Sequence, residues 1–487
     1  MLFHSFDYAI LLGLAWIVYW SIQTFTNLQT TATVRLQNLW LIVCSYIFYG
    51  WWDVRFAGLM ATSTLVDYSV GRLMSSVSPA KRKGLMTLSV VVNLGLLGTF
   101  KYFNFFVESL AAGAESLGWR LDTPTLGVIL PVGISFYTLQ TLGYTIDVYR
   151  RRIAACHDAA AFFAYVAFFP QLVAGPIERA SNMLPQFASP RRPIHWAAGA
   201  DALRQILWGL FKKVIVADTC GVMADDIFAR TDSVGGSTLM LGVIYFGFQI
   251  YGDFSGYSDI AIGSAKLFGI TLMRNFDRPY FATSPSDFWS RWHISLSTWF
   301  RDYVYIPLGG NRRGGGRMVL NWFVVFTVSG LWHGAAANFV IWGWWHFAGL
   351  VVQRYLFRPI VPPRIPKLIE ACLGWIVTMA FVFVGWTAFR IGDLPSWWRV
   401  LSEIASASLF APVQASRIGL LPVALLVIGE IVSGSQAYPI CGWFRRRPNH
   451  LTGKVVLRIV RWMIYLVVSA AVLGYLRPQS PFIYFQF

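Results

Sequence analysis

Charged side chains are scarce in this chain of 487 residues. Only 13% of the residues are Asp, Glu, Lys or Arg, about half the share in a typical soluble domain, whereas 56% are apolar and 17% aromatic. The core of a soluble globule does not need so much apolar and aromatic side chain. The composition therefore excludes an ordinary soluble protein and indicates an all-α protein that crosses a membrane many times.

Cysteine and acidic residues are also few. None of the five cysteines belongs to a C-x-x-C pair, so neither a disulfide framework nor a zinc knuckle is indicated. The 23 acidic residues against 40 Lys and Arg leave a net charge of +17. Such an excess suggests nucleic acid as the partner of a soluble protein, but in a membrane protein it must first be interpreted by position.

Runs of about 20 mainly apolar residues, the length that a crossing helix needs, recur about twelve times. We predict spans at residues 7–24, 36–52, 55–76, 84–104, 124–147, 200–223, 237–268, 318–336, 338–356, 368–389, 417–436 and 456–476. The run at 237–268 is too long for one straight helix, and we expect a break at its Gly-Asp-Phe-Ser-Gly sequence, which contains Asp253. The first run has neither the basic start nor the cleavage site of a signal peptide.

The basic residues predict the orientation of these spans. With the N-terminus outside, 27 of the 40 Lys and Arg fall on the inner side, as the positive-inside rule requires. An even number of crossings then places both termini outside the cytoplasm, including the tail at residues 478–487. The positive charge is thereby explained by topology, and no nucleic-acid partner is expected.

Two inner segments are not simple loops. Residues 158–190 contain an apolar run that is too short to cross and is interrupted by Pro170 and Pro176, which predicts a re-entrant or in-plane segment. The segment 286–317 begins with an amphipathic pattern over 286–305, typical of a helix along the membrane face.

A basic, glycine-rich loop completes this second segment. It carries Arg312, Arg313 and Arg317. Two interpretations stay open for the loop: a topology signal, or a docking site for a phosphorylated ligand.

Only seven histidines occur, and polar groups at membrane depth are functional candidates. His333 lies about 24 Å along a helix from Arg317, where an imidazole can take a proton from a hydroxyl nucleophile or act only as a buried hydrogen-bonding group. For His293, the stronger interpretation from its position alone is that of a residue bordering the aromatic face of the amphipathic helix at the membrane interface, and His346 is similarly ambiguous. The three come from separate elements without a nearby carboxylate, so no metal site is expected.

Two carboxylates flank the expected break in 237–268. Asp253 and Asp259 could form the cation site of a transporter, or they could simply cap the broken helix. A transport function therefore stays open at this point.

Several motifs together match a known family. They are Asp253-Phe254-Ser255-Gly256-Tyr257-Ser258-Asp259, Arg291-Trp292-His293-Ile294-Ser295-Leu296-Ser297, Ile306-Pro307-Leu308-Gly309-Gly310-Asn311-Arg312 and Gly330-Leu331-Trp332-His333-Gly334. With them the chain resembles the membrane-bound O-acyltransferases (MBOAT), in particular the bacterial AlgI/PatA-like branch, which is related to DltB. The resemblance implies one membrane domain over residues 1–487, with about 11–12 transmembrane helices around a tunnel that traverses the membrane.

The resemblance also implies a function. His333 would be the catalytic histidine and His293 a second functional histidine. The donor would be cytoplasmic acetyl-CoA, with Arg312, Arg313 and Arg317 near its nucleotide and no bound cofactor or metal. The expected activity is O-acetylation of an extracytoplasmic polysaccharide, such as alginate, or of peptidoglycan. The resemblance further implies that the activity takes place at the bacterial inner membrane, among membrane lipids, with a separate SGNH-like periplasmic transferase as partner.

The end of the chain, Phe482-Ile483-Tyr484-Phe485-Gln486-Phe487, resembles the C-terminal motif of a small partner peptide of the D-alanylation system. The resemblance implies that Tyr484 takes the acyl group, with His333 as base, and passes it to the periplasmic partner. Alternatively, the tail is only an aromatic anchor at the membrane interface. Two rival functions also remain: acylation of a lipid-linked acceptor, and transport through the break near Asp253.

Overall fold

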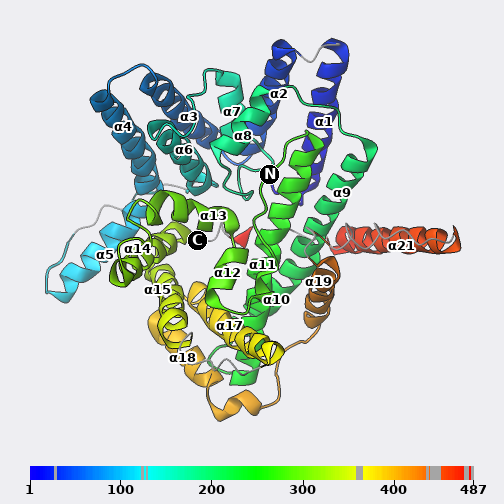
Figure 1. Cartoon of the computed structure of the whole chain (residues 1–487). Coiled ribbons are helices and arrows are strands. Elements are labelled where there is room, and N and C mark those ends of the chain that lie inside the picture. The colour runs from blue at the N-terminus through cyan, green and yellow to red at the C-terminus, as the bar shows by residue number, and fades with distance from the viewer. Residues whose placement is uncertain are drawn as a thin grey trace. The chain divides into compact units, whose positions relative to one another are not determined.

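The computed structural model describes residues 1–26, 30–121, 126–127, 130–357, 366–434, 438, 451–475 and 482–483. Every regular element in these ranges is a helix, which confirms the predicted all-α fold (Figure 1). The chain divides into two compact units. One comprises Met1–Gly199 with Ser264–Met273, and the other comprises Ala200–Gly263 with Arg274–Phe487.

The first unit is built from paired helices. Its elements are α1 (Phe6–Thr26), α2 (Thr31–Gly50), α3 (Val54–Met74), α4 (Pro79–Leu97), η1 (Gly98–Tyr102), α5 (Phe103–Ser116), α6 (Ile134–Tyr149), α7 (Ala159–Ala167) and α8 (Ala180–Ala188). α1 packs on α2, and α3, α4 and α6 pack on one another. Within the predicted segment 158–190, α7 ends three residues before Pro170, whereas α8 contains Pro185.

The second unit begins within α9 (Trp196–Leu210). Its further elements are η2 (Phe211–Ala217), α10 (Asp218–Phe228), α11 (Gly236–Leu267), η3 (Pro279–Phe281), α12 (Pro285–Arg291), α13 (Ile294–Phe300), η4 (Arg301–Tyr305), α14 (Gly315–His333), α15 (Ala337–Val352), η5 (Gln353–Phe357), α17 (Lys367–Arg390), α18 (Leu394–Ile404), η6 (Ala407–Phe410), α19 (Leu420–Ser433) and α21 (Leu451–Tyr475). α14 and α15 lie side by side (Figure 1).

Four helical stretches of the described chain are long and apolar enough to cross a membrane by length and composition. They are Phe6–Thr26, Pro79–Ser116, Lys367–Arg390 and Arg458–Tyr475. The other predicted spans also overlap helices, although the helix in the predicted span 124–147 begins only at Ile134, and α2, α3 and α11 carry several buried polar side chains. A polytopic membrane fold is thus confirmed, whereas the number of crossings stays a prediction.

The expected break in the run at 237–268 is wrong, because α11 continues as one α-helix from Gly236 to Leu267. Its glycines instead permit close packing against the preceding helices. A Cβ atom on Gly256 would lie 2.7 Å from the Gly209 carbonyl oxygen, and one on Gly252 would lie 3.0 Å from the Lys212 carbonyl oxygen. The glycines therefore let η2 approach the middle of α11.

The expected single helix at 286–305 is also wrong. The chain forms α12 and α13, which are separated at Trp292 and His293, and then the π-helical turn η4. His293 has a φ of 43°, in the left-handed region that few residues other than glycine adopt. The break places His293 at a corner, where it caps α13.

Candidate functional site

His333 is the last residue of α14, and its side chain is only 3% exposed. Two glycines let α15 pack closely beside it. A Cβ atom on Gly330 would collide with the Phe339 carbonyl, and one on Gly343 would collide with the Phe326 carbonyl. The imidazole is therefore held where two tightly packed helices meet.

His293 is held at its corner by a polar contact with the loop before α12. The Asn275 carbonyl accepts the Ile294 N–H at 2.9 Å, and its side-chain oxygen accepts the Ser295 hydroxyl at 2.9 Å. The Asn275 amide donates in turn to Ser258 on α11 at 3.3 Å. His293 is fully buried on this segment outside the predicted spans, and burial lowers its pKa to about 3. The ring is therefore neutral at physiological pH.

The two histidines singled out from the sequence lie close together in the second unit. Their ring centroids are 6.4 Å apart, and Trp332 packs against both, at 5.7 Å from His293 and 5.0 Å from His333. Two buried imidazoles among aromatic rings form an arrangement that suits proton transfer from a hydroxyl group.

His346 occupies an adjoining aromatic cage. Trp342 lies 4.9 Å from His346 and 4.9 Å from His333, measured between ring centroids, so it stands against both imidazoles. Trp289 and Trp386 complete the cage at 5.0 and 6.4 Å from His346. The indole N–H groups of these three tryptophans are buried, and they donate to no residue within the described ranges. A buried N–H group without a hydrogen-bond acceptor costs free energy, so an acceptor atom of a ligand is a natural partner for these groups.

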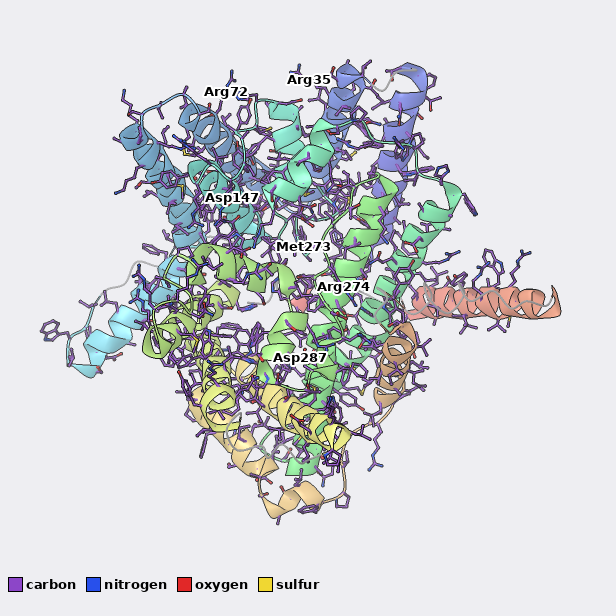
Figure 2. The ribbon with its side chains drawn as sticks, viewed as in Figure 1. Arg35, Arg72, Asp147, Met273, Arg274 and Asp287 are labelled. Atoms are coloured by element: carbon purple, nitrogen blue, oxygen red, sulfur yellow. The ribbon has the colours of Figure 1, made fainter. Side chains whose placement is uncertain are left out.

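A cavity of about 550 Å³ opens beside this cage. Its lining residues are Ser286, Trp289, Ser290, Ile294, Ser297, Thr298, Arg301, Trp322, Leu350, Gln353 and Arg354. Hydroxyl groups and two arginines dominate its polar wall, and Trp289 belongs to both the cavity and the cage. Asp287, labelled in Figure 2, follows the lining residue Ser286 on α12 and accepts a hydrogen bond from Arg291, one turn later on the same helix, at 2.7 Å.

The arginines expected at a nucleotide are not in this wall. Arg312 and Arg313 are exposed in the turn after η4, and Arg317 lies in the first turn of α14, where its Nε donates to the Leu308 carbonyl at 3.4 Å. Asn321 fixes the loop by donating to the Gly310 carbonyl at 2.9 Å. The structure therefore offers Arg301 and Arg354 as the basic residues of the cavity.

The carboxylates of the transporter alternative are both paired with lysines. Asp253 lies 2.9 Å from the Lys213 ammonium, and Asp259 lies 2.8 Å from the Lys212 ammonium. A bound cation would have to displace an ammonium group from each carboxylate. The two features that favoured a transporter were these carboxylates and the expected helix break. The carboxylates form ion pairs with lysines, and α11 is continuous.

Tyr484 lies outside the described residues, as does most of the segment 478–487. Its neighbours Phe482 and Ile483 are described, and both are buried in the second unit, at 0% and 2% exposure. The Phe482 ring lies 5.7 Å from the Phe254 ring, which lies 4.7 Å from the His293 ring. A single phenylalanine therefore separates the described part of the tail from the paired histidines.

Sequence reasoning missed several of these residues. Lys212 and Lys213 stood inside a predicted span, where charges must be paired. That rule could have matched them with Asp253 and Asp259. Trp342 gave no comparable signal, because 22 tryptophans occur and most have an ordinary packing role.

Known proteins resemble this chain over most of its length. A model of the membrane-bound O-acyltransferase family, MBOAT, matches residues 148–391, which include both His293 and His333. The probable alginate O-acetylase AlgI of Azotobacter vinelandii is 40% identical over 384 residues, which cover 78% of this chain and 75% of that one. The peptidoglycan O-acetyltransferase of Helicobacter pylori is 36% identical over 390 residues, with coverages of 75% and 73%.

A more distant relative is the teichoic acid D-alanyltransferase of Streptococcus thermophilus, which is 32% identical over 239 residues, or 47% of this chain and 57% of that one. The family match and the two longer alignments confirm the resemblance seen in the motifs. The chain belongs to the membrane-bound O-acyltransferase family and is an O-acyltransferase.

Proposed function

We propose that this enzyme moves an acetyl group from cytoplasmic acetyl-CoA across the bacterial inner membrane for O-acetylation of an extracytoplasmic polysaccharide or peptidoglycan. The names of the alginate and peptidoglycan relatives support both the acetyl group and the glycan acceptor. The observation that carries the proposal is the buried pair His293 and His333, joined through Trp342 and Trp289 to a polar cavity.

The cavity is suited to the donor. Arg301 and Arg354 offer guanidinium groups for phosphates, and the serine and threonine hydroxyls offer further donors. In the predicted orientation these residues lie on the cytoplasmic side. Trp289 leads from the cavity to the cage, which is the direction in which the thioester has to extend toward His333.

The proposed transfer balances as a nucleophilic substitution at the thioester carbonyl. His333 accepts the phenolic proton of Tyr484 while the phenolic oxygen attacks the carbonyl carbon. The carbon–sulfur bond then breaks, and CoA leaves as a thiol with the proton from His333. An SGNH-like periplasmic partner takes the acetyl group from Tyr484 and esterifies the glycan hydroxyl.

The developing oxyanion needs hydrogen-bond donors, and Trp342 offers one beside His333. Trp342→Phe is expected to lower kcat about 100-fold with little change in KM, because the donor acts mainly on the transition state. Trp345→Phe is the matched control, since the Trp345 indole already donates to the Phe381 carbonyl at 2.9 Å. Equal kcat values for the two variants in a thiol-release assay would exclude Trp342 from this role.

The donor cavity makes a prediction about acetyl-CoA affinity. Arg301→Gln and Arg354→Gln are each expected to raise the KM for acetyl-CoA about 5- to 10-fold, which allows for the exposure of both side chains. Arg312→Gln and Arg313→Gln serve as controls, because they lie outside the cavity and should change KM less than 2-fold. The reverse ranking would place the nucleotide on the basic loop instead.

The function is tested by incubating the purified protein in lipid nanodiscs with acetyl-labelled CoA. We expect CoA release and label on Tyr484, detected by mass spectrometry of the C-terminal peptide. Label on lipid, with none on the chain, would instead support a lipid-linked acceptor. The absence of any acetyl-CoA turnover with or without an acceptor would contradict the enzyme proposal.

A further inference from the structure

The buried end of the tail contacts a charged group deep in the second unit. The backbone N–H of Ile483 donates to Oδ2 of Asp253 at 2.6 Å. The other oxygen of this carboxylate, Oδ1, lies 2.9 Å from Nζ of Lys213. A backbone amide of the tail is thus bound by an ion pair that is itself almost entirely buried.

Lys213 is shared between two carboxylates. Its Nζ also lies 2.7 Å from Oδ1 of Asp218, at the start of α10. Lys213 and Asp253 have side-chain exposures of only 1% and 3%. Removing the two charges from water costs free energy that their attraction only partly offsets. Such a pair therefore stabilises the fold little compared with apolar residues of the same size. A binding role explains its position better than a contribution to stability does.

Aromatic contacts hold the same stretch of tail from the side. The Phe482 ring lies 4.6 Å from Tyr257 and 5.7 Å from Phe254, one α-helical turn apart on α11. Lys213 lies 5.8 Å from the centroid of the Tyr257 ring. The rings that contact Phe482 and the carboxylate that binds Ile483 therefore all belong to α11.

We propose that Asp253, Lys213 and Asp218 form a clamp that fixes the register of the C-terminal segment, with Asp253 as a positioning residue. This inference rests on the proposed function, since the residue that follows the clamped Ile483 in the chain is Tyr484. The hydrogen bond fixes the main chain at Ile483, and the Phe482 ring packs against Tyr257 and Phe254. The clamp thereby selects which side chain of the tail is presented for acetylation.

The most direct test uses a substitution in the tail, because a change there leaves the residues of the helices unaltered. Ile483→Pro removes the donated N–H, whereas Ile483→Val keeps it. Hydrogen–deuterium exchange of the C-terminal peptide should be roughly 10- to 100-fold faster in Ile483→Pro than in the wild type, because a hydrogen bond to a buried carboxylate is lost. Acetyl label on Tyr484 should fall by a similar factor, with both readouts unchanged in Ile483→Val.

A second pair of variants tests the other partner. Asp253→Asn and Asp259→Asn both remove the charge of a lysine-paired carboxylate on α11, but only Asp253 contacts Ile483. Faster exchange of the tail in Asp253→Asn alone would support the clamp. Equal exchange in both variants, or wild-type exchange as fast as that of Ile483→Pro, would overturn it.

The two proposals can fail separately. A protected tail with no label on Tyr484 would contradict the acyl relay and leave the clamp standing. A labelled Tyr484 in a wild-type tail that exchanges as fast as an unbound peptide would contradict the clamp and leave the relay standing.

Discussion

Replacement of His333 by alanine or glutamine is expected to lower acetyl-CoA turnover about 10²- to 10⁴-fold, the usual contribution of a positioned general base. Glutamine fills the site and retains hydrogen bonding, but it cannot accept the proton of the nucleophile. The two variants together therefore separate the loss of the base from the loss of packing against Trp332 and Trp342.

The control for this experiment is His195→Ala, since His195 is exposed and lies in the loop before α9. Its turnover should match that of the wild type in nanodiscs. If His333→Gln kept more than about a tenth of the turnover with an unchanged melting profile, proton transfer by His333 would be contradicted.

Tyr484→Phe is expected to abolish acetylation of the external glycan, with a decrease of at least about 100-fold, because phenylalanine has no oxygen to carry the acetyl group. The substitution keeps the aromatic ring, so any anchoring of the tail at the interface is preserved. The measurement is glycan O-acetylation in cells that express the variant in place of the wild type.

Tyr475→Phe is the matched control, because Tyr475 is an exposed tyrosine at the end of α21. It should support normal acetylation. Full acetylation by Tyr484→Phe would overturn the relay, and label found on lipid in that variant would favour the lipid-linked acceptor.

The sequence was most informative about features that depend on residues near one another in the chain. Long apolar runs predicted helices, and the scarcity of polar groups drew attention to His293 and His333, whose rings lie 6.4 Å apart. The motifs around these histidines predicted the family, which the comparisons confirm. The roles of the two histidines and of Tyr484 stay predictions.

Features that depend on distant neighbours could not be predicted. The left-handed backbone at His293 is supported by Asn275, which belongs to another segment, and no glycine or proline marks the corner. Similarly, Gly256 was interpreted as a helix break. Its actual role depends on the close approach of Gly209 from α9. Only the three-dimensional packing distinguishes a glycine that bends a helix from one that lets another backbone pass.

The aromatic rings around the histidines affect which chemical groups can pass them. His333 is enclosed by Trp332, Trp342 and Phe389, and His346 by Phe288, Trp289, Phe381 and Trp386. Hydrated ions cross such an apolar surrounding only at a high electrostatic cost, whereas a neutral acetyl ester does not meet that barrier. In the proposed transfer, the same rings that pack around the imidazoles would therefore let the neutral acyl group pass more readily than a hydrated ion.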